Sequence, residues 1–310
     1  MIHFRFLLGI LLAASPVAAQ PFAVQSTGRS YSSLPEALAA IGDGEDVVVI
    51  APGRYQDCAV QSAGRITYRA EKPSTVLFDG GICEGKAALV LRGRGATVDG
   101  LVFQNMRVPD GNGAGIRLER GPLTVVETTF RNSEAGIMGA FEDRTSDVVI
   151  ENSTFSGLGR CDRGLSCAHS IYLSGNRSVT VRGCLFEAGR GGHYLKSRAP
   201  MATVLANKFD DSRGRATNYM IDLSEGATGR IERNIFIQGT NKENHSAIIA
   251  VAMESRRNRS AGLTITGNRA SFAAPAPWTT NFLSDGSGTP KRISGNIFGA
   301  GIQGISTSFP

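Results

Sequence analysis

The sequence has few aromatic residues and no long apolar run beyond its first residues. Aromatic side chains make up 7% of the 310 residues, with one tryptophan, so a large core of packed aromatic rings is not expected. After residue 19, no segment approaches the roughly 18 apolar residues that a membrane-spanning helix needs. Glycine is plentiful, but it does not recur at every third position, which excludes a collagen triple helix.

Clustered positive charge and metal-binding motifs are also lacking. Lysine and arginine are scattered and do not alternate with aromatic residues, so nucleic-acid binding is not expected. There is no Cys-x-x-Cys pair for zinc. Asp110-Gly111-Asn112 and Asp210-Asp211 offer oxygen ligands for calcium, but neither has a third carboxylate nearby, and both are more typical of turns. We therefore predict no cofactor.

Residues 1–19 have the features of a secretory signal peptide. A basic start containing Arg5 precedes an apolar run from Phe6 to Ala14, and small residues then end at Ala19. Removing Arg5 reduces the formal net charge from +6 to +5, and this excess slightly favours an acidic partner such as an anionic polysaccharide. We expect an exported protein, either periplasmic or secreted, that does not span the membrane; its oligomeric state is left open.

A short phrase ending in phenylalanine recurs along the chain. It combines β-branched residues with Asn or Gly, and its intervals of 23 to 34 residues average about 27.5 when Ala270 is counted in place of one phenylalanine. Short strands separated by turns at this period predict an all-β, single-domain parallel β-helix over residues 20–310. The phenylalanines expected inside the helix are Phe103, Phe130, Phe155, Phe186, Phe209, Phe236 and Phe298.

Two further features fit such a solenoid. Ser32 and Ser33 are N-cap candidates before Leu34-Pro35-Glu36, which predicts a short helix capping the open N-terminal end. Export implies an oxidising compartment, so cysteines are expected to pair.

The five cysteines cannot all pair with one another. Cys58 and Cys83 are about one coil apart and would lie above one another, while Cys161 and Cys167 flank a glycine-containing loop, so we expect these two disulfides. Cys184 shares the parity of Phe186 and should be a buried free thiol.

The helix candidate followed by Ile50-Ala51-Pro52-Gly53-Arg54-Tyr55, together with the repeated Asn-x-Phe coils, resembles the pectate-lyase-like superfamily of right-handed parallel β-helix proteins. The resemblance covers most of the chain after residue 19. It implies the fold but not one reaction, because that superfamily contains lyases, hydrolases, epimerases and proteins without known activity.

Aligning the coils on one inward apolar position predicts an outward column one residue later. Its members are Arg117, Met138, Tyr172, Lys196, Asp222, Ile249 and Ser284. Tyr172, Lys196 and Asp222 should be vertical neighbours on adjacent strands. The residues flanking them are His169, His193, Tyr194, Arg198 and Tyr219. This concentration of His, Tyr, Lys and Arg is the best candidate site in the sequence.

The chemistry of these side chains suits an enzyme that acts on a uronate polysaccharide. Lysis needs a cation beside the carboxylate, a base for the C5 proton and an acid for the leaving oxygen. Leu195-Lys196-Ser197 is similar to the Asn-Lys-Ser stretch of the chondroitinase B and alginate lyase family, which implies that Lys196 is the base. The sequence departs from that family at two positions: Leu195 stands where the family has asparagine, and Asp222 stands where the family has arginine. Arg198 could take the place of that arginine.

We assign Lys196, Arg198, Tyr172 and His193 as catalytic candidates, with the remaining site residues in substrate binding: His169, Arg117, Tyr194, Tyr219 and Asp222. Two structural alternatives stay open. Lys196 and Asp222 could form only a surface ion pair, and His169 and His193 could be core or edge residues. The functional alternatives are a lyase or epimerase of anionic glycans and a non-catalytic glycan-binding or cell-envelope protein.

Overall fold

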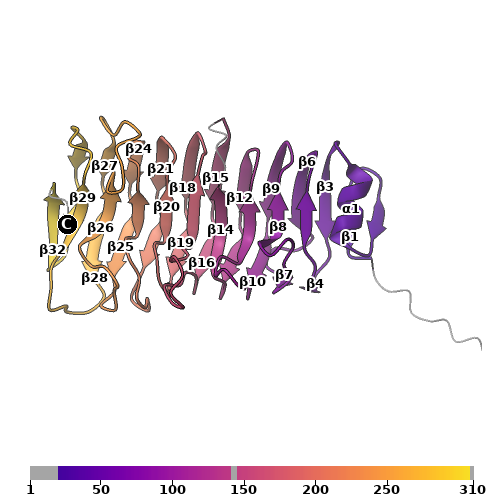
Figure 1. Ribbon diagram of the computed structural model, residues 1–310, viewed down its shortest axis with the longest axis horizontal. Coiled ribbons are helices and arrows are strands. Elements are labelled where there is room, and N and C mark those ends of the chain that lie inside the picture. Colours follow the sequence, from indigo (N-terminus) through magenta and orange to yellow (C-terminus); the bar gives the residue numbers. More distant parts are fainter. Residues whose placement is uncertain (1–19, 141–144, 308–310) are drawn as a thin grey trace, which may run out of the picture.

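The computed structural model describes residues 20–140 and 145–307 of the chain, so the predicted signal peptide lies outside the described residues. These residues form a parallel β-solenoid whose coils stack along one axis, from the N-terminal helix α1 to strand β32 (Figure 1). Each coil contributes one strand to each of three sheets, which we call sheets A, B and C. The predicted all-β parallel β-helix is confirmed.

Sheet A has twelve strands, in the spatial order β2 (Arg29–Tyr31), β1 (Phe22–Val24), β3 (Glu45–Ile50), β6 (Arg65–Ala70), β9 (Gly95–Asp99), β12 (Leu123–Val126), β15 (Asp147–Glu151), β18 (Ser178–Arg182), β21 (Met201–Leu205), β24 (Thr228–Glu232), β27 (Thr264–Thr266) and β30 (Arg292–Ser294). Strand β1 pairs antiparallel with both β2 and β3, whereas every later pairing in this sheet is parallel.

Sheets B and C have ten strands each. Sheet B contains β4 (Gly53–Tyr55), β7 (Val76–Asp79), β10 (Leu101–Gln104), β13 (Thr129–Arg131), β16 (Thr154–Ser156), β19 (Leu185–Glu187), β22 (Lys208–Asp210), β25 (Ile235–Gln238), β28 (Arg269–Phe272) and β31 (Ile297–Phe298). Sheet C contains β5 (Ala59–Gln61), β8 (Ala87–Leu91), β11 (Ala114–Leu118), β14 (Ala135–Ala140), β17 (Ile171–Ser174), β20 (Leu195–Ser197), β23 (Ile221–Leu223), β26 (Ala247–Val251), β29 (Thr280–Asp285) and β32 (Ile302–Ser306).

The interior is dominated by a ladder of phenylalanines on sheet B. From Phe78 to Phe236, neighbouring rings are stacked with centroids 4.6 to 5.4 Å apart, and each ring is fully buried. The prediction that Phe298 belongs to this buried stack is wrong, because its side chain is 38% exposed. Ala270 interrupts the ladder one coil earlier, and β31 is an edge strand that no further coil of the described residues covers.

Side-chain hydrogen bonds continue the coil-to-coil stacking at the corner between sheets A and B. Asn207, Asn234 and Asn268 each donate from Nδ2 to the Oδ1 of the next asparagine, over 2.9 to 3.0 Å, and the series ends at Asn296. Cys184 occupies the preceding position, is buried and forms no disulfide, as predicted. The buried side-chain amides therefore find their hydrogen-bond partners in the equivalent asparagines of neighbouring coils.

The N-terminal end is closed by α1 (Leu34–Ile41), as predicted. The Ser33 hydroxyl caps the helix by accepting a hydrogen bond from the Glu36 backbone N–H, and Leu34 is buried against the first coil. The structure contains both predicted disulfides, Cys58–Cys83 and Cys161–Cys167. No helix within the described residues is long and apolar enough to cross a membrane.

Candidate functional site

The outward face of sheet C carries the predicted column of functional side chains. Tyr172 on β17 pairs in register with Lys196 on β20, and Lys196 pairs with Asp222 on β23, so the three are vertical neighbours as predicted. The next member is Ala250 and not Ile249, because β26 is shifted by one residue relative to the alignment. Every residue of β26 is buried, so alternation could not reveal its register.

A connected ionic network surrounds this column. Lys196 Nζ donates to Glu254 Oε1 and lies 3.5 Å from Asp222 Oδ2. Arg198 donates to three groups: from Nη2 to Glu254, from Nη1 to Glu225 Oε1 at 3.0 Å, and from Nε to the Tyr172 hydroxyl at 3.0 Å. We call Tyr172, Lys196, Arg198, Asp222, Glu225 and Glu254 the sheet C cluster.

Glu254 is the most accessible carboxylate of the sheet C cluster. Its side chain is 42% exposed and bridges Lys196 and Arg198, of which Lys196 is only 11% exposed. The Glu254 backbone N–H donates to the Ser224 carbonyl at 3.0 Å, which holds the residue above the cations. Burial alone would raise the Glu254 pKa, but hydrogen bonding to Lys196 and the charges of both cations outweigh it and lower that pKa.

Asp222 lies next to this bridge, and its pKa is shifted in the opposite direction. Burial raises its pKa to about 6, although Lys196 and the hydroxyl of Ser224 partly oppose the shift. Its Oδ1 atom is buried without a hydrogen-bond partner among the described residues. The site therefore combines one carboxyl group whose pKa is raised, to about 6, with another whose pKa is lowered.

A stack of planar rings lies beside the cluster, at the side where each coil enters sheet C. The His169 and His193 rings are 4.8 Å apart, and Tyr219 stacks on His193 at 5.4 Å. Burial lowers the pKa of His169 to about 3, with the Lys196 charge adding to the shift. Its Nδ1 accepts a hydrogen bond from the His193 backbone N–H at 2.9 Å, so the neutral ring carries its proton on Nε2.

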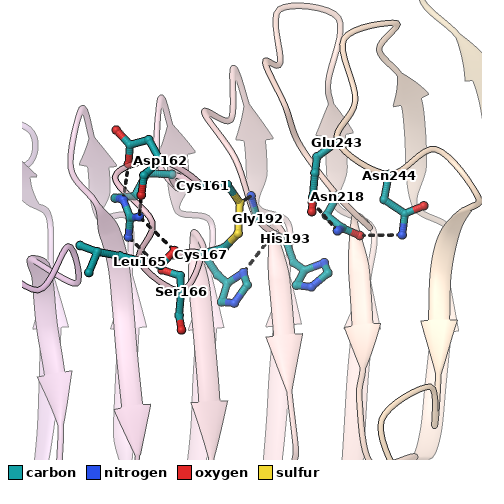
Figure 2. The surroundings of a disulfide bond; sticks show 12 residues. Cys161, Asp162, Leu165, Ser166, Cys167, Gly192, His193, Asn218, Glu243 and Asn244 are labelled. Atoms are coloured by element: carbon teal, nitrogen blue, oxygen red, sulfur yellow. Dashed lines mark hydrogen bonds and ion pairs between the residues drawn. A yellow bond between two sulfur atoms is a disulfide. The ribbon is translucent and has the colours of Figure 1, made fainter.

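The Cys161–Cys167 disulfide anchors the loop that leads to this ring stack (Figure 2). Cys161 Sγ accepts a hydrogen bond from the Gly192 backbone N–H at 3.2 Å, one residue before His193. Figure 2 also shows Asn218, which is hydrogen-bonded to Glu243 and Asn244 of the following coil. The rings of His169 and His193 are thus held by covalent and polar contacts outside the strands.

Two predicted substrate-binding residues lie outside both the sheet C cluster and the ring stack. Tyr194 is 1% exposed and points inward, and its hydroxyl donates to Asp211 Oδ1 at 2.7 Å. The assignment of Tyr194 to substrate contact is therefore wrong: the residue lies just before β20, outside the alternation of the strand, and its ring is buried in the interior. Arg117 belongs to the outward column, but Met138 separates it from Tyr172, and its ion-pair partner is Glu119.

His193, which was predicted to be catalytic, does not face solvent as a general acid or base would. Burial holds its pKa well below the ordinary value, with the neighbouring His169 as the next cause. Its Nε2 is 3.5 Å from Asp222 Oδ2, and its Nδ1 has no hydrogen-bond partner in the described part of the chain. These contacts suit a neutral ring that packs beside the cluster and orients Asp222.

Sequence reasoning missed Glu225 and Glu254. Both lie after their strands, in the connections from sheet C to sheet A, where period-two alternation no longer assigns a side chain to a face. One feature of the sequence could have revealed them: Glu225 lies two residues after the end of β23, and Glu254 lies three residues after the end of β26. Arg198 likewise directly follows its strand, β20.

Comparison with known proteins identifies the fold. The family described as the right-handed β-helix region matches residues 87–270 and 139–307. Among solved structures, a PL6-family alginate lyase is 16% identical with a TM-score of 0.44, over 85% of this chain and 38% of the lyase, so the chain spans well under half of that protein's length.

Two other solved structures have similarly low identity. A pectin methylesterase in complex with a hexasaccharide is 8% identical, with a TM-score of 0.42 over 92% of this chain and 91% of that one. The catalytic unit of an α-1,3-glucanase from Streptomyces thermodiastaticus is 13% identical, with a TM-score of 0.39 over 96% and 69%. No curated protein matches the chain.

Proposed function

This chain belongs to the right-handed β-helix family, and we propose that it acts on a uronate-containing polysaccharide at the sheet C cluster, as a lyase or an epimerase. The observation that carries the proposal is the bridge formed by Glu254. Lys196 and Arg198 converge on one carboxylate, so their spacing suits the carboxylate of a bound uronate. A substrate carboxylate would replace that of Glu254.

Both reactions begin by removing the proton at C5 of the uronate. Two cations on the substrate carboxylate stabilise the negative charge that develops when the C5–H bond breaks. Glu254, displaced from Lys196 and Arg198, would lose the contacts that lower its pKa and become a stronger base beside the substrate. In this scheme Glu254 receives the C5 proton.

Tyr172 supplies the acid. Its hydroxyl accepts from Arg198 Nε, which leaves its own proton free to be donated. In elimination, the C5–H electrons form the C4–C5 double bond, the C4–O bond breaks, and Tyr172 protonates the leaving oxygen. In epimerisation, Tyr172 would return a proton to C5 from the opposite face. We assign Lys196 to charge neutralisation and not to proton removal, because an ammonium group held between carboxylates must lose its own proton before it can accept one.

The test is a panel of uronate polysaccharides, assayed for unsaturated product by ultraviolet absorbance and for inverted C5 by NMR. Glu254→Gln and Tyr172→Phe should each lower kcat about 10²- to 10⁴-fold with the fold intact, and Lys196→Ala should abolish turnover. Arg230→Ala, an exposed change on β24 of sheet A, is the matched control and should retain activity. Full activity in Glu254→Gln would eliminate it as the base.

Glycan binding without catalysis is the second candidate. It is favoured because Asp222 and His193 are almost fully buried, which leaves fewer acid and base groups able to reach a bound substrate. A non-catalytic protein would bind the polysaccharides of the panel without releasing any product. If the protein neither binds nor converts any of them, both candidates are eliminated.

We also propose export to the periplasm or the medium. Two disulfides are typical of proteins that fold outside a reducing cytosol. Fractionation of the native source followed by intact-mass analysis tests this, since an exported mature chain should start near residue 20. A full-length chain confined to the cytosol would contradict the proposal.

A further inference from the structure

A second surface of the solenoid, away from the sheet C cluster, gathers arginines where each coil leaves sheet B. Two depressions of about 460 Å³ and 610 Å³ lie there and share Arg190. The first is also lined by Arg107 and Arg163, and the second by Arg213 and Arg215. We call these five residues and the depressions they line the arginine groove.

Carboxylates neutralise only part of this charge. Arg163 pairs with Glu134 and Arg213 with Glu187, both within 2.8 Å. The side-chain partner of Arg190 is the neutral amide oxygen of Asn132, at 2.7 Å.

Arg107 and Arg215 are exposed, and neither pairs with a carboxylate among the described residues. Three guanidinium groups are thus available to a ligand, whereas the cations of the sheet C cluster are paired with carboxylates.

Buried polar contacts hold the wall of the arginine groove. Arg160 is 7% exposed and donates from Nη1 to the carbonyl of Ser166 at 2.9 Å, inside the loop closed by Cys161–Cys167. Glu134 is 1% exposed and accepts from the backbone N–H groups of two residues in the loop after β10, which carries Arg107. These contacts therefore hold the backbone that presents Arg107 and Arg163.

The groove follows the long axis of the solenoid. Its arginines come from coils that start with β10 and end with β22, which are four strand spacings apart, or about 19 Å. Charges repeated along such a length match a linear polyanion better than a single small anion. Arginine binds carboxylate and sulfate oxygens through paired hydrogen bonds.

We propose that the arginine groove binds a linear acidic polysaccharide bearing carboxylates or sulfates, independently of the sheet C cluster. Nucleic acid is the competing polyanion. Proteins that bind single strands stack the bases on aromatic side chains, and no described residue lining either depression is aromatic. The charge pattern without stacking surfaces favours the glycan.

The experiment measures the affinity of the full chain for polygalacturonate, dextran sulfate, neutral dextran and single-stranded DNA over a range of salt concentrations. The variant combines Arg107→Ala, Arg190→Ala and Arg215→Ala. Its matched control removes the same charge from the exposed Arg230, Arg269 and Arg292, which lie outside the groove. A Lys196→Ala/Arg198→Ala variant disables the sheet C cluster separately.

We expect the groove variant to lose roughly tenfold or more in polyanion affinity, with a salt slope lower by about one for each arginine removed. Replacing the same arginines with lysine should preserve most of the slope. The control and the sheet C variant should retain groove binding, so a failure of the proposed enzyme function would not remove it.

Polygalacturonate carries carboxylates and dextran sulfate carries sulfates, so the two polymers show which anion the groove prefers. Binding of either one supports the proposal. Equal affinity in the groove variant and the parent, tighter binding of DNA than of both acidic glycans, or the absence of binding to any polyanion would overturn the proposal.

Discussion

The buried carboxyl group of Asp222 predicts an unusual dependence of stability on pH. Its pKa is raised from 3.8 to about 6 in the folded chain, mainly by burial. A raised carboxyl pKa means that the folded state binds the proton more tightly than the unfolded state. The associated stability is present below about pH 4 and is lost as the pH rises through 6. The shift corresponds to about 3 kcal/mol at pH 7.

Asp222→Asn removes the charge while keeping the shape, so it should stabilise the protein by up to about 3 kcal/mol at pH 7 and have little effect near pH 4. Urea unfolding of parent and variant at a series of pH values measures this difference. Asp147→Asn is the control of opposite sign, because hydrogen bonding to Arg177 lowers the pKa of that partly exposed carboxyl.

In the control, the contribution of Asp147 is present above the unfolded pKa and is lost as the pH falls, so the substitution should weaken the fold only at neutral pH. The reasoning about Asp222 is refuted if Asp222→Asn is more destabilising at pH 7 than at pH 4. That result would mean that attraction to Lys196 outweighs the burial of the Asp222 carboxylate.

Three further predictions concern the interior. Phe155→Ala should cost about 3–5 kcal/mol of unfolding free energy by opening a cavity in the phenylalanine ladder, measured by denaturant titration; a loss below about 1 kcal/mol would contradict a core role. Asp211→Ala should destabilise by about 3–5 kcal/mol in the same assay, because it leaves the fully buried Lys242 uncompensated. Burial raises the pKa of Cys184 to about 11, so a thiol reagent should modify it only after unfolding, as judged by mass spectrometry.

The repetitive part of the fold could be predicted because each coil repeats the same packing problem. Phe103, Phe130 and Phe155 occupy one column because inward positions must meet their equivalents in the next coil. Cys58 and Cys83 could be paired from the same period. Prediction failed where the repeat weakens: Phe298 lies on β31, the edge strand of sheet B in the described part of the chain, and its side chain is exposed.

The candidate site was predictable to the extent that it lies on strands. Tyr172, Lys196 and Asp222 follow from alternation and register, whereas β26 has buried residues throughout and could be aligned to either parity. Tyr194 was misplaced because it lies one residue before β20, where the backbone still turns into the sheet. The direction of a side chain on a connection depends on the conformation of that loop, which does not repeat from coil to coil and so cannot be predicted from the period of the sequence.

The missed carboxylates alter the chemistry that the sequence suggested. With Lys196, Arg198 and Asp222 as its only charged groups, the predicted site would keep a net positive charge and attract an anionic glycan. Glu225 and Glu254 convert it into a balanced network, in which a ligand must compete with a carboxylate already in place. Tight binding of a polyanion by charge alone is then the property expected of the arginine groove, whereas the sheet C cluster should favour a ligand whose carboxylate can replace that of Glu254.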